Sequence, residues 1–98
     1  MLNKTPCVYM MASLSRVIYI GVTSNLGVRV WQHKNKTNPN SFATRYHCTR
    51  LVWYEEFSRM DDAIAFEKAL KGKVRRKKID LIERNNPDWR DLSASWEI

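Results

Sequence analysis

Residues 7–22 read CVYMMASLSRVIYIGV, and this stretch predicts a β-hairpin. Two runs rich in β-branched and aromatic residues, 7–12 and 17–22, flank the short segment Ser-Leu-Ser at 13–15. With the turn centred on Leu14, Tyr9 faces Tyr19 across the strand pair. Side chains alternate between the faces of a strand, so the second run divides into an apolar face and a less apolar one. Ile18, Ile20 and Val22 share the apolar face, whereas Val17, Tyr19 and Gly21 share the other.

The two tyrosines are therefore expected to lie off the main core face. A phenol is buried at low cost only when its hydroxyl finds a partner, and two hydroxyls on this face can be presented to a ligand. Alternatively, Tyr9 and Tyr19 are half-buried strand aromatics without a chemical role. Gly21 also has two interpretations, a bend at a strand end or room for a substrate backbone.

A helix is predicted after the hairpin. Residues 23–25 (Thr-Ser-Asn) are all good N-cap types, and Leu26 and Val30 begin an apolar stripe at i, i+4 spacing. Arg29 and His33 fall beside this stripe. An arginine there can offer a planar fork to a phosphate, and the histidine can exchange a hydrogen bond with a neighbouring oxygen. The alternatives are a snorkelling arginine and a boundary histidine.

A later helix carries a carboxylate on its apolar side. Ser58 and Asp61 resemble a capping box, and the predicted apolar stripe consists of Ala63, Phe66, Leu70 and Val74. Helical projection places Glu67 in the middle of this stripe. A buried ionised carboxylate must pair, bind a metal, change protonation or line a cavity. Glu67 is therefore either a functional carboxylate or half of a helical pair with Lys71.

The order of these residues resembles the GIY-YIG nuclease superfamily. The two family motifs read Cys-Val-Tyr at 7–9 and Tyr-Ile-Gly at 19–21, followed by Arg29, His33 and Glu67. The chain looks closest to small stand-alone bacterial proteins similar to the N-terminal nuclease module of the UvrC subunit. The resemblance implies an α+β fold with a three-stranded antiparallel sheet and the order β-β-α-β-α-α. Its third strand would be residues 51–57.

The chain departs from the family pattern at two places. Cys7 replaces the first glycine, and residues 77–80 (Lys-Lys-Ile-Asp) lack the asparagine that related nucleases often carry beyond the glutamate. Asn85 and Asn86 occur only later, where Pro87 favours a helix end after a helical segment at 79–83. Residues 89–96 are expected to pack back through their tryptophans.

Charge and length favour one small domain that contacts a polyanion. The 98 residues, taken as a single nuclease domain over 1–98, carry 17 Lys and Arg against 10 Asp and Glu, a net charge of +7. The basic run spans residues 68–78, and a second basic surface surrounds the loop at 38–41. The residues predicted to contact nucleic acid are Lys34, Arg45, Tyr46, Lys71, Arg75 and Arg76. Arg45 and Tyr46 either hold a phosphate and stack on a base or fasten the loop to the sheet.

The remaining composition indicates a cytoplasmic protein. Residues 1–6 are polar and the following apolar run is too short for a secretory leader or a membrane span. Cys7 and Cys48 are expected to be reduced thiols, and with His33 and His47 they make a poor zinc set. The sequence does not fix the oligomeric state.

The resemblance implies a metal-dependent DNA endonuclease, selective for structure and acting in repair or processing. Glu67 would bind Mg²⁺ or Mn²⁺, Arg29 would neutralise phosphoryl charge, and Tyr9 would activate the water. Tyr19 and His33 would position the phosphate or relay the proton. The alternatives are a catalytically weak nucleic-acid-binding module with the same fold and a protein-interaction adaptor. The expected substrate is branched, flapped or nicked DNA.

Overall fold

The computed structural model describes residues 4–97. The first three residues, on which the expected absence of a leader partly rests, lie outside this part. The core of the fold is an antiparallel sheet with the strand order β2-β1-β3, built from β1 (Cys7–Ala12), β2 (Ile18–Thr23) and β3 (Arg50–Glu56). The predicted α+β class and three-stranded antiparallel sheet are confirmed.

The hairpin register differs from the predicted one by two residues. Tyr9 lies opposite Gly21, and Tyr19 lies opposite Met11, so the prediction that the two tyrosines face each other is wrong. The Ser13 N–H donates to the Val17 carbonyl at 3.0 Å. The loop therefore contains three residues and is centred on Ser15 instead of Leu14. Its last residue, Arg16, has a φ of 69°, as is common for three-residue hairpin loops.

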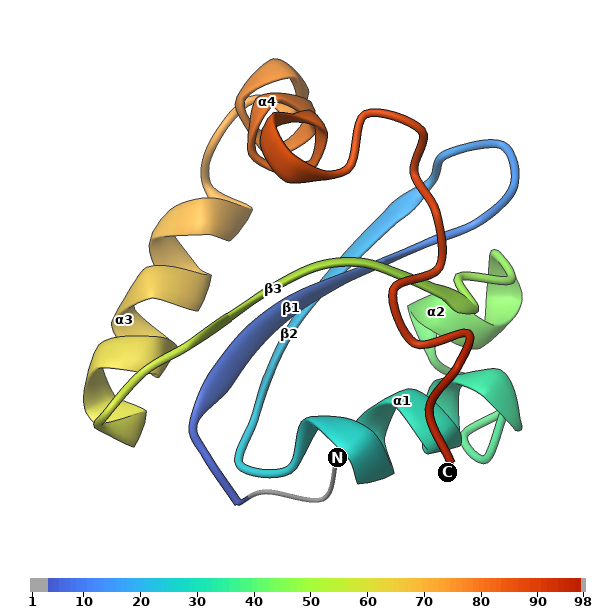
Figure 1. Cartoon of the computed structure of the whole chain (residues 1–98), viewed down its shortest axis with the longest axis horizontal. Helices are drawn as coiled ribbons and strands as arrows, with labels where there is room; N and C mark the ends of the chain where they lie inside the picture. The colour runs from blue at the N-terminus through green and yellow to red at the C-terminus, as the bar shows by residue number, and fades with distance from the viewer. Residues whose placement is uncertain (1–3, 98) are drawn as a thin grey trace.

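In the described part of the chain, four helices cover the sheet, two on each face (Figure 1). α1 (Leu26–Lys34) and the short α2 (Phe42–Arg45) lie on the face that carries the tyrosines. α3 (Met60–Lys71) and α4 (Arg75–Asn85) cover the opposite face. The element order matches the predicted one except for α2, for which no helix was predicted.

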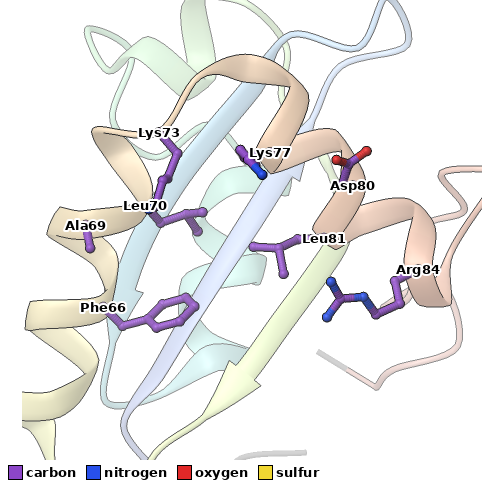
Figure 2. A pocket seen from close by; sticks show the side chains of 8 residues that line it. All are labelled: Phe66, Ala69, Leu70, Lys73, Lys77, Asp80, Leu81 and Arg84. Atoms are coloured by element: carbon purple, nitrogen blue, oxygen red, sulfur yellow. The ribbon is translucent and has the colours of Figure 1, made fainter.

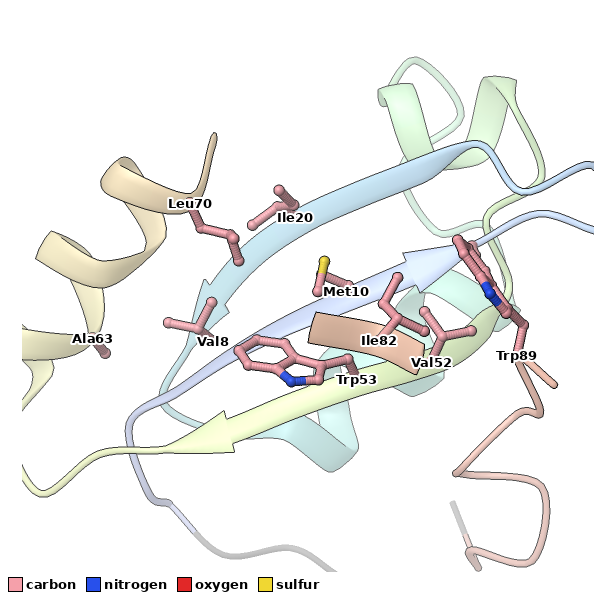
Figure 3. Close-up of a cluster of buried hydrophobic side chains, with 10 residues drawn as sticks. Val8, Met10, Ile20, Val52, Trp53, Ala63, Leu70, Ile82 and Trp89 are labelled. Atoms are coloured by element: carbon pink, nitrogen blue, oxygen red, sulfur yellow. The ribbon is translucent and has the colours of Figure 1, made fainter. Parts of the chain in front are cut away.

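The first core lies between the sheet and α3 and α4 (Figure 3). A β-bulge shifts the register of β1 with β3 between Met10 and Met11. Met10 lies opposite Trp53, and Met11 lies opposite Leu51, so Val52 is the extra residue of the bulge. Because of this bulge, the neighbours Val52 and Trp53 both belong to the first core.

The tyrosine face is also buried, and it holds a second core. Cys7, Tyr9 and Met11 of β1 pack there with Leu26 and Val30 of α1. Tyr9 has no exposed surface. The predicted placement of the tyrosines off the main apolar face is correct, but Tyr9 is a core residue because α1 closes over this side of the sheet.

The predicted capping box and apolar stripe of α3 are partly wrong. The N-cap of α3 is Arg59, without a side-chain cap, instead of Ser58. The helix ends at Lys71 because Gly72 is its C-cap, and glycine is a poor helix former. Val74, the predicted last member of the stripe, is 67% exposed and is the N-cap of α4. α4 consequently begins at Arg75, four residues before the predicted segment.

The C-terminal tail packs back on the fold through its tryptophans, as predicted. Trp89 is 1% exposed and belongs to the first core. Its ring lies beneath the Arg16 guanidinium at 4.9 Å, and its N–H donates to Glu83 at 2.8 Å. Trp96 lies edge-on against Tyr54. The tail therefore ties the hairpin loop to α4. Within residues 4–97, no helix is long and apolar enough to span a bilayer.

Candidate active site

Four of the five predicted catalytic residues lie together on the tyrosine face. Tyr9 and Tyr19 come from neighbouring strands, while Arg29 and His33 come from α1. The Tyr9 hydroxyl lies 2.8 Å from His33 Nε2, and the Tyr19 ring centroid lies 6.2 Å from that of Tyr9 and 5.1 Å from that of His33. Arg29 lines the same cavity as Tyr19 and His33.

The turn into α1 explains why this helix reaches the two strands. Asn25 is the N-cap, and its side-chain oxygen accepts the Val28 N–H at 3.2 Å. Thr23, the last residue of β2, accepts the Asn25 N–H at 3.0 Å. The helix therefore starts directly after β2. Residues 29 and 33 are one helical turn apart and share the face toward the tyrosines.

Gly21 is required by the tyrosine of the first motif. Tyr9 lies opposite Gly21, and a Cβ at residue 21 would be 2.5 Å from the Tyr9 hydroxyl oxygen. This distance is far inside van der Waals contact. The glycine thus makes room for a phenol of the same chain, an explanation that neither sequence interpretation included.

We expect Gly21→Ala to destabilise the protein by about 1–3 kcal/mol, because the Tyr9 ring is fully buried and cannot move aside freely. Chemical denaturation measures the change. Gly72→Ala is the matched control, since its Cβ would meet nothing closer than 3.5 Å. Equal effects of the two substitutions would show that the Tyr9 contact is unimportant.

A cavity of about 130 Å³ opens beside the four residues. Tyr19, Arg29 and His33 line it, whereas Tyr9 does not. The other lining residues are Gln32, Thr37, Asn38, Ser41 and Thr44. A ligand in this cavity therefore meets a phenol, a guanidinium and an imidazole, and the buried Tyr9 lies behind them.

Burial controls the protonation of the two hydrogen-bonded groups. It raises the pKa of Tyr9 far above its usual value, an effect that nearby Tyr19 reinforces and Arg29 opposes. Burial, followed by the charge of Arg29, lowers the pKa of His33 to about 4. At neutral pH both partners are therefore uncharged.

The His33 ring should protonate near pH 4 in the folded protein, which NMR of its ring protons can measure. The unfolded chain takes up this proton near pH 6.5, so it binds more protons than the folded state between these values. The contribution of His33 to the unfolding free energy is therefore full above about pH 6.5 and falls as the pH drops toward 4. A midpoint above pH 6 would contradict the burial of this ring.

Glu67 is buried as predicted, on the helix that covers the other face of the sheet. It is 8% exposed on α3, beside Ala63 and Leu70 of the first core. Lys71 Nζ lies 2.8 Å from its carboxylate, so the predicted helical pair is also present. Within residues 4–97, neither the lining of the 130 Å³ cavity nor the Tyr9–His33 hydrogen bond includes Glu67.

Asn86 does not supply the asparagine of related nucleases. Asn86 is the C-cap of α4, and its side chain donates to the carbonyls of Val52 and Arg90 and accepts the Arg90 N–H. These bonds hold the tail against β3. The signal in the sequence was the Asn-Pro pair at 86–87, which indicated a helix end.

Most of the predicted nucleic-acid contacts already have partners inside the protein. Lys34 pairs with Asp91, and Lys71 pairs with Glu67. Arg75 donates to the Arg16 carbonyl at 2.7 Å, and Arg76 lies 3.3 Å from Asp80. Arg45 and Tyr46 are exposed, with the guanidinium 6.0 Å from the ring centroid.

The basic run lines a different hollow from the one beside the tyrosines. This hollow, of about 320 Å³, lies between α3 and α4 (Figure 2). Phe66, Leu70 and Leu81 contribute apolar surface there, and Lys73 and Lys77 lie at its rim. It shares no lining residue with the cavity that contains Arg29.

The two cysteines are buried in the second core. Burial raises the pKa of the Cys7 thiol to about 12, with a smaller effect from Glu56. The residue that replaces the first glycine of the family motif is therefore a packed, protonated thiol. His47 lies at the surface, where its ring bonds to Lys36. The described residues contain no group of three or more His, Cys, Asp or Glu side chains that could hold a metal ion.

The model of a known family matches most of the chain. The model of the GIY-YIG catalytic domain matches residues 5–80, which include both tyrosines, Arg29, His33 and Glu67. The chain belongs to the GIY-YIG family. The resemblance drawn from the motifs is thus confirmed. The match ends before the tail, so Trp89 lies outside it.

This GIY-YIG protein is also similar to a viral protein. The relative is described as "UPF0213 protein in VLF1-GP41 intergenic region" of Autographa californica nuclear polyhedrosis virus. The two are 34% identical over 65 residues, which cover 60% of this chain and 62% of the viral protein. The chain therefore spans less than two thirds of that relative. No solved structure matches it significantly.

Proposed function

We propose that this GIY-YIG protein is an endonuclease that hydrolyses DNA phosphodiester bonds with the help of a divalent metal ion. The observation that carries the proposal is the meeting of Tyr19, Arg29 and His33 at one cavity, with Tyr9 bonded behind them. Family membership supports the same chemistry. The net charge of +7 supports a nucleic-acid substrate.

Arg29 binds the scissile phosphate in this proposal. Its planar guanidinium offers two parallel donors to phosphate oxygens, and it lines the cavity from the partly buried surface of α1. A fixed cation in a poorly hydrated position stabilises the charge that develops in the transition state. Together with burial, which has the larger effect, the Arg29 charge lowers the pKa of His33.

His33 and Tyr19 position the attacking water in this proposal. His33 faces the cavity, but with a pKa of about 4 its ring is a weak base, so we assign it the orienting of the water through a hydrogen bond. Tyr19 faces the same cavity and orients the water or the phosphate. Tyr9 has no exposed surface, so we assign it the positioning of the His33 ring instead of direct contact with water.

Glu67 would hold the metal ion. The fit rests on the chemistry of the donor, since a carboxylate is a ligand that Mg²⁺ or Mn²⁺ accepts, and Mg²⁺ sites often use one or two carboxylates plus water and phosphate. Glu67 is 8% exposed and its charge is compensated by Lys71, a residue whose side chain is 52% exposed and can turn to solvent. An ion held there next to the scissile phosphate would offset negative charge on the phosphate and on the leaving 3′ oxygen.

A second candidate function is a nucleic-acid-binding module that does not cut. The observation that favours it is the Glu67–Lys71 ion pair, because a carboxylate satisfied by a lysine has no need of a metal. Asn86 also favours the binding module, because its side chain is bonded to β3 and the tail. This module would share the fold, the basic surface and the salt-dependent affinity for DNA.

The deciding experiment incubates the purified protein with linear, nicked, flapped and branched DNA, with Mg²⁺, with Mn²⁺ or with a chelator. Metal-dependent cutting, strongest on one of the structured substrates, supports the nuclease and its selectivity. Salt-sensitive binding without cutting under every condition supports the binding module. Affinity that does not fall with added salt would argue for a protein-interaction adaptor.

A further inference from the structure

A row of aromatic rings leads out of the cavity to the surface. The rings of Tyr19 and Phe42 are nearly parallel, with centroids 6.4 Å apart and an interplanar angle of 28°. Phe42 and Tyr46 follow with centroids 4.7 Å apart. Tyr19 lines the cavity beside Arg29. We call Tyr19, Phe42 and Tyr46 the aromatic row.

The two outer rings of the row are exposed. Phe42 is 47% and Tyr46 is 46% exposed, although both come from the segment that forms α2 and its C-cap. Large aromatic side chains side by side at the surface lose apolar burial, and such patches commonly mark binding sites. These rings therefore have capacity to stack on a further flat group.

Other residues hold α2 in place. Ala43 is 2% exposed and Cys48 is fully buried, and the Cys48 N–H donates to the Ala43 carbonyl at 2.8 Å. Ser41 caps the helix by accepting the Thr44 N–H at 3.1 Å. The segment is therefore fastened by residues other than the two exposed rings.

The charge around the row suits a phosphate backbone. The Arg45 guanidinium lies 6.0 Å from the Tyr46 ring centroid and is exposed. Lys36 reaches the same region, where its ammonium lies 3.0 Å from a ring nitrogen of His47. Exposed aromatic rings beside cations are the combination that proteins use to bind single-stranded nucleic acid.

We propose that the aromatic row is a binding subsite for unpaired bases of a DNA strand whose adjacent phosphate lies in the cavity. This inference rests on the proposed function. Bases inside a duplex stack on one another and offer no free face, so the row selects DNA with unpaired nucleotides next to the bond that is cut. Flapped DNA has this feature, whereas a blunt duplex does not.

Binding without divalent metal tests the subsite separately from cutting. Fluorescence anisotropy compares a blunt duplex, the same duplex with a single-stranded extension, and that extension with abasic nucleotides. Phe42→Ala and Tyr46→Ala should each weaken binding of the normal extension by about 5- to 150-fold, the range reported for loss of one stacked base. Binding of the blunt and abasic DNAs should change less than about twofold.

Trp31→Ala is the matched control, because Trp31 is 44% exposed on α1 and lies outside the row. The affinity of Trp31→Ala for every DNA should stay within about twofold of that of the parent protein. Phe42→Trp keeps a stacking ring and should restore binding, and thermal unfolding shows that each variant is folded.

Equal losses for the extension and the abasic DNA, or the same loss in Trp31→Ala, would overturn the subsite. Because no metal is present, this result is independent of whether the protein cuts DNA. If the predicted binding pattern is observed but no substrate is cut, the subsite proposal stands and the nuclease proposal is wrong.

Discussion

Replacing Glu67 with glutamine should lower metal-dependent DNA cleavage by about 1,000-fold or more, while DNA binding in a chelator stays within about threefold. A bound metal contributes several kcal/mol to transition-state stabilisation, and each 1.4 kcal/mol is a factor of ten in rate. Glutamine keeps the volume of this nearly buried side chain but removes its charge. Cleavage rates with Mg²⁺ and with Mn²⁺ measure the loss.

Lys71→Gln is the matched control, because it breaks the same ion pair from the other side. It leaves the Glu67 carboxylate without its internal partner, so the variant should be less stable than the parent in a chelator. Added Mg²⁺ should restore this stability, since a ligand bound only by the folded state raises the unfolding free energy. If Glu67 served the fold alone, both variants would lose stability alike and Mg²⁺ would rescue neither.

Arg29→Ala is expected to lower the cleavage rate at saturating DNA by about 100- to 1,000-fold, the loss typical of a removed charge-stabilising donor, about 2.7–4 kcal/mol. Arg29→Lys should recover little of the lost cleavage rate, because an ammonium cannot make the two parallel hydrogen bonds of a guanidinium. The substitution also removes a charge that lowers the pKa of His33. NMR titration should therefore show that the pKa of His33 rises in Arg29→Ala.

Arg59→Ala provides the charge-matched comparison. Arg59 lies at the start of α3 in an exposed pair with Asp61, and its loss lowers the net charge by the same amount. Affinity and its salt dependence should change similarly in both variants if long-range attraction alone matters. A cleavage rate in Arg59→Ala as low as that of Arg29→Ala would remove Arg29 from the proposed chemistry.

The sequence predicted the elements of the sheet well because their signals are local. Composition indicated both hairpin strands, and the polar residues before Leu26 indicated the start of α1. The register failed because an arginine can adopt a left-handed conformation at the loop end, which no composition rule anticipates. The boundary between α3 and α4 was placed too late because the apolar spacing appeared to continue across Gly72.

The identities of the candidate site residues could be predicted from the sequence, but their depth and arrangement could be predicted only in part. Tyr9, Tyr19, Arg29 and His33 were grouped by their order in the chain, and the structure places them together. The depth of Tyr9 depends on α1 closing over the sheet, a tertiary effect that strand alternation cannot reveal. Phe42 was missed because nothing in its neighbourhood predicted a helix as short as α2.

The fit of the Tyr9 hydroxyl over Gly21 couples the two family motifs to each other. A residue larger than glycine at 21 favours a smaller residue at 9, whereas Cys7 pairs with Thr23 and is free of this constraint. A distant relative in which the glycine has been replaced should therefore show a compensating change at its first tyrosine. Such paired departures would identify degenerate members of the family that a search for each motif separately overlooks.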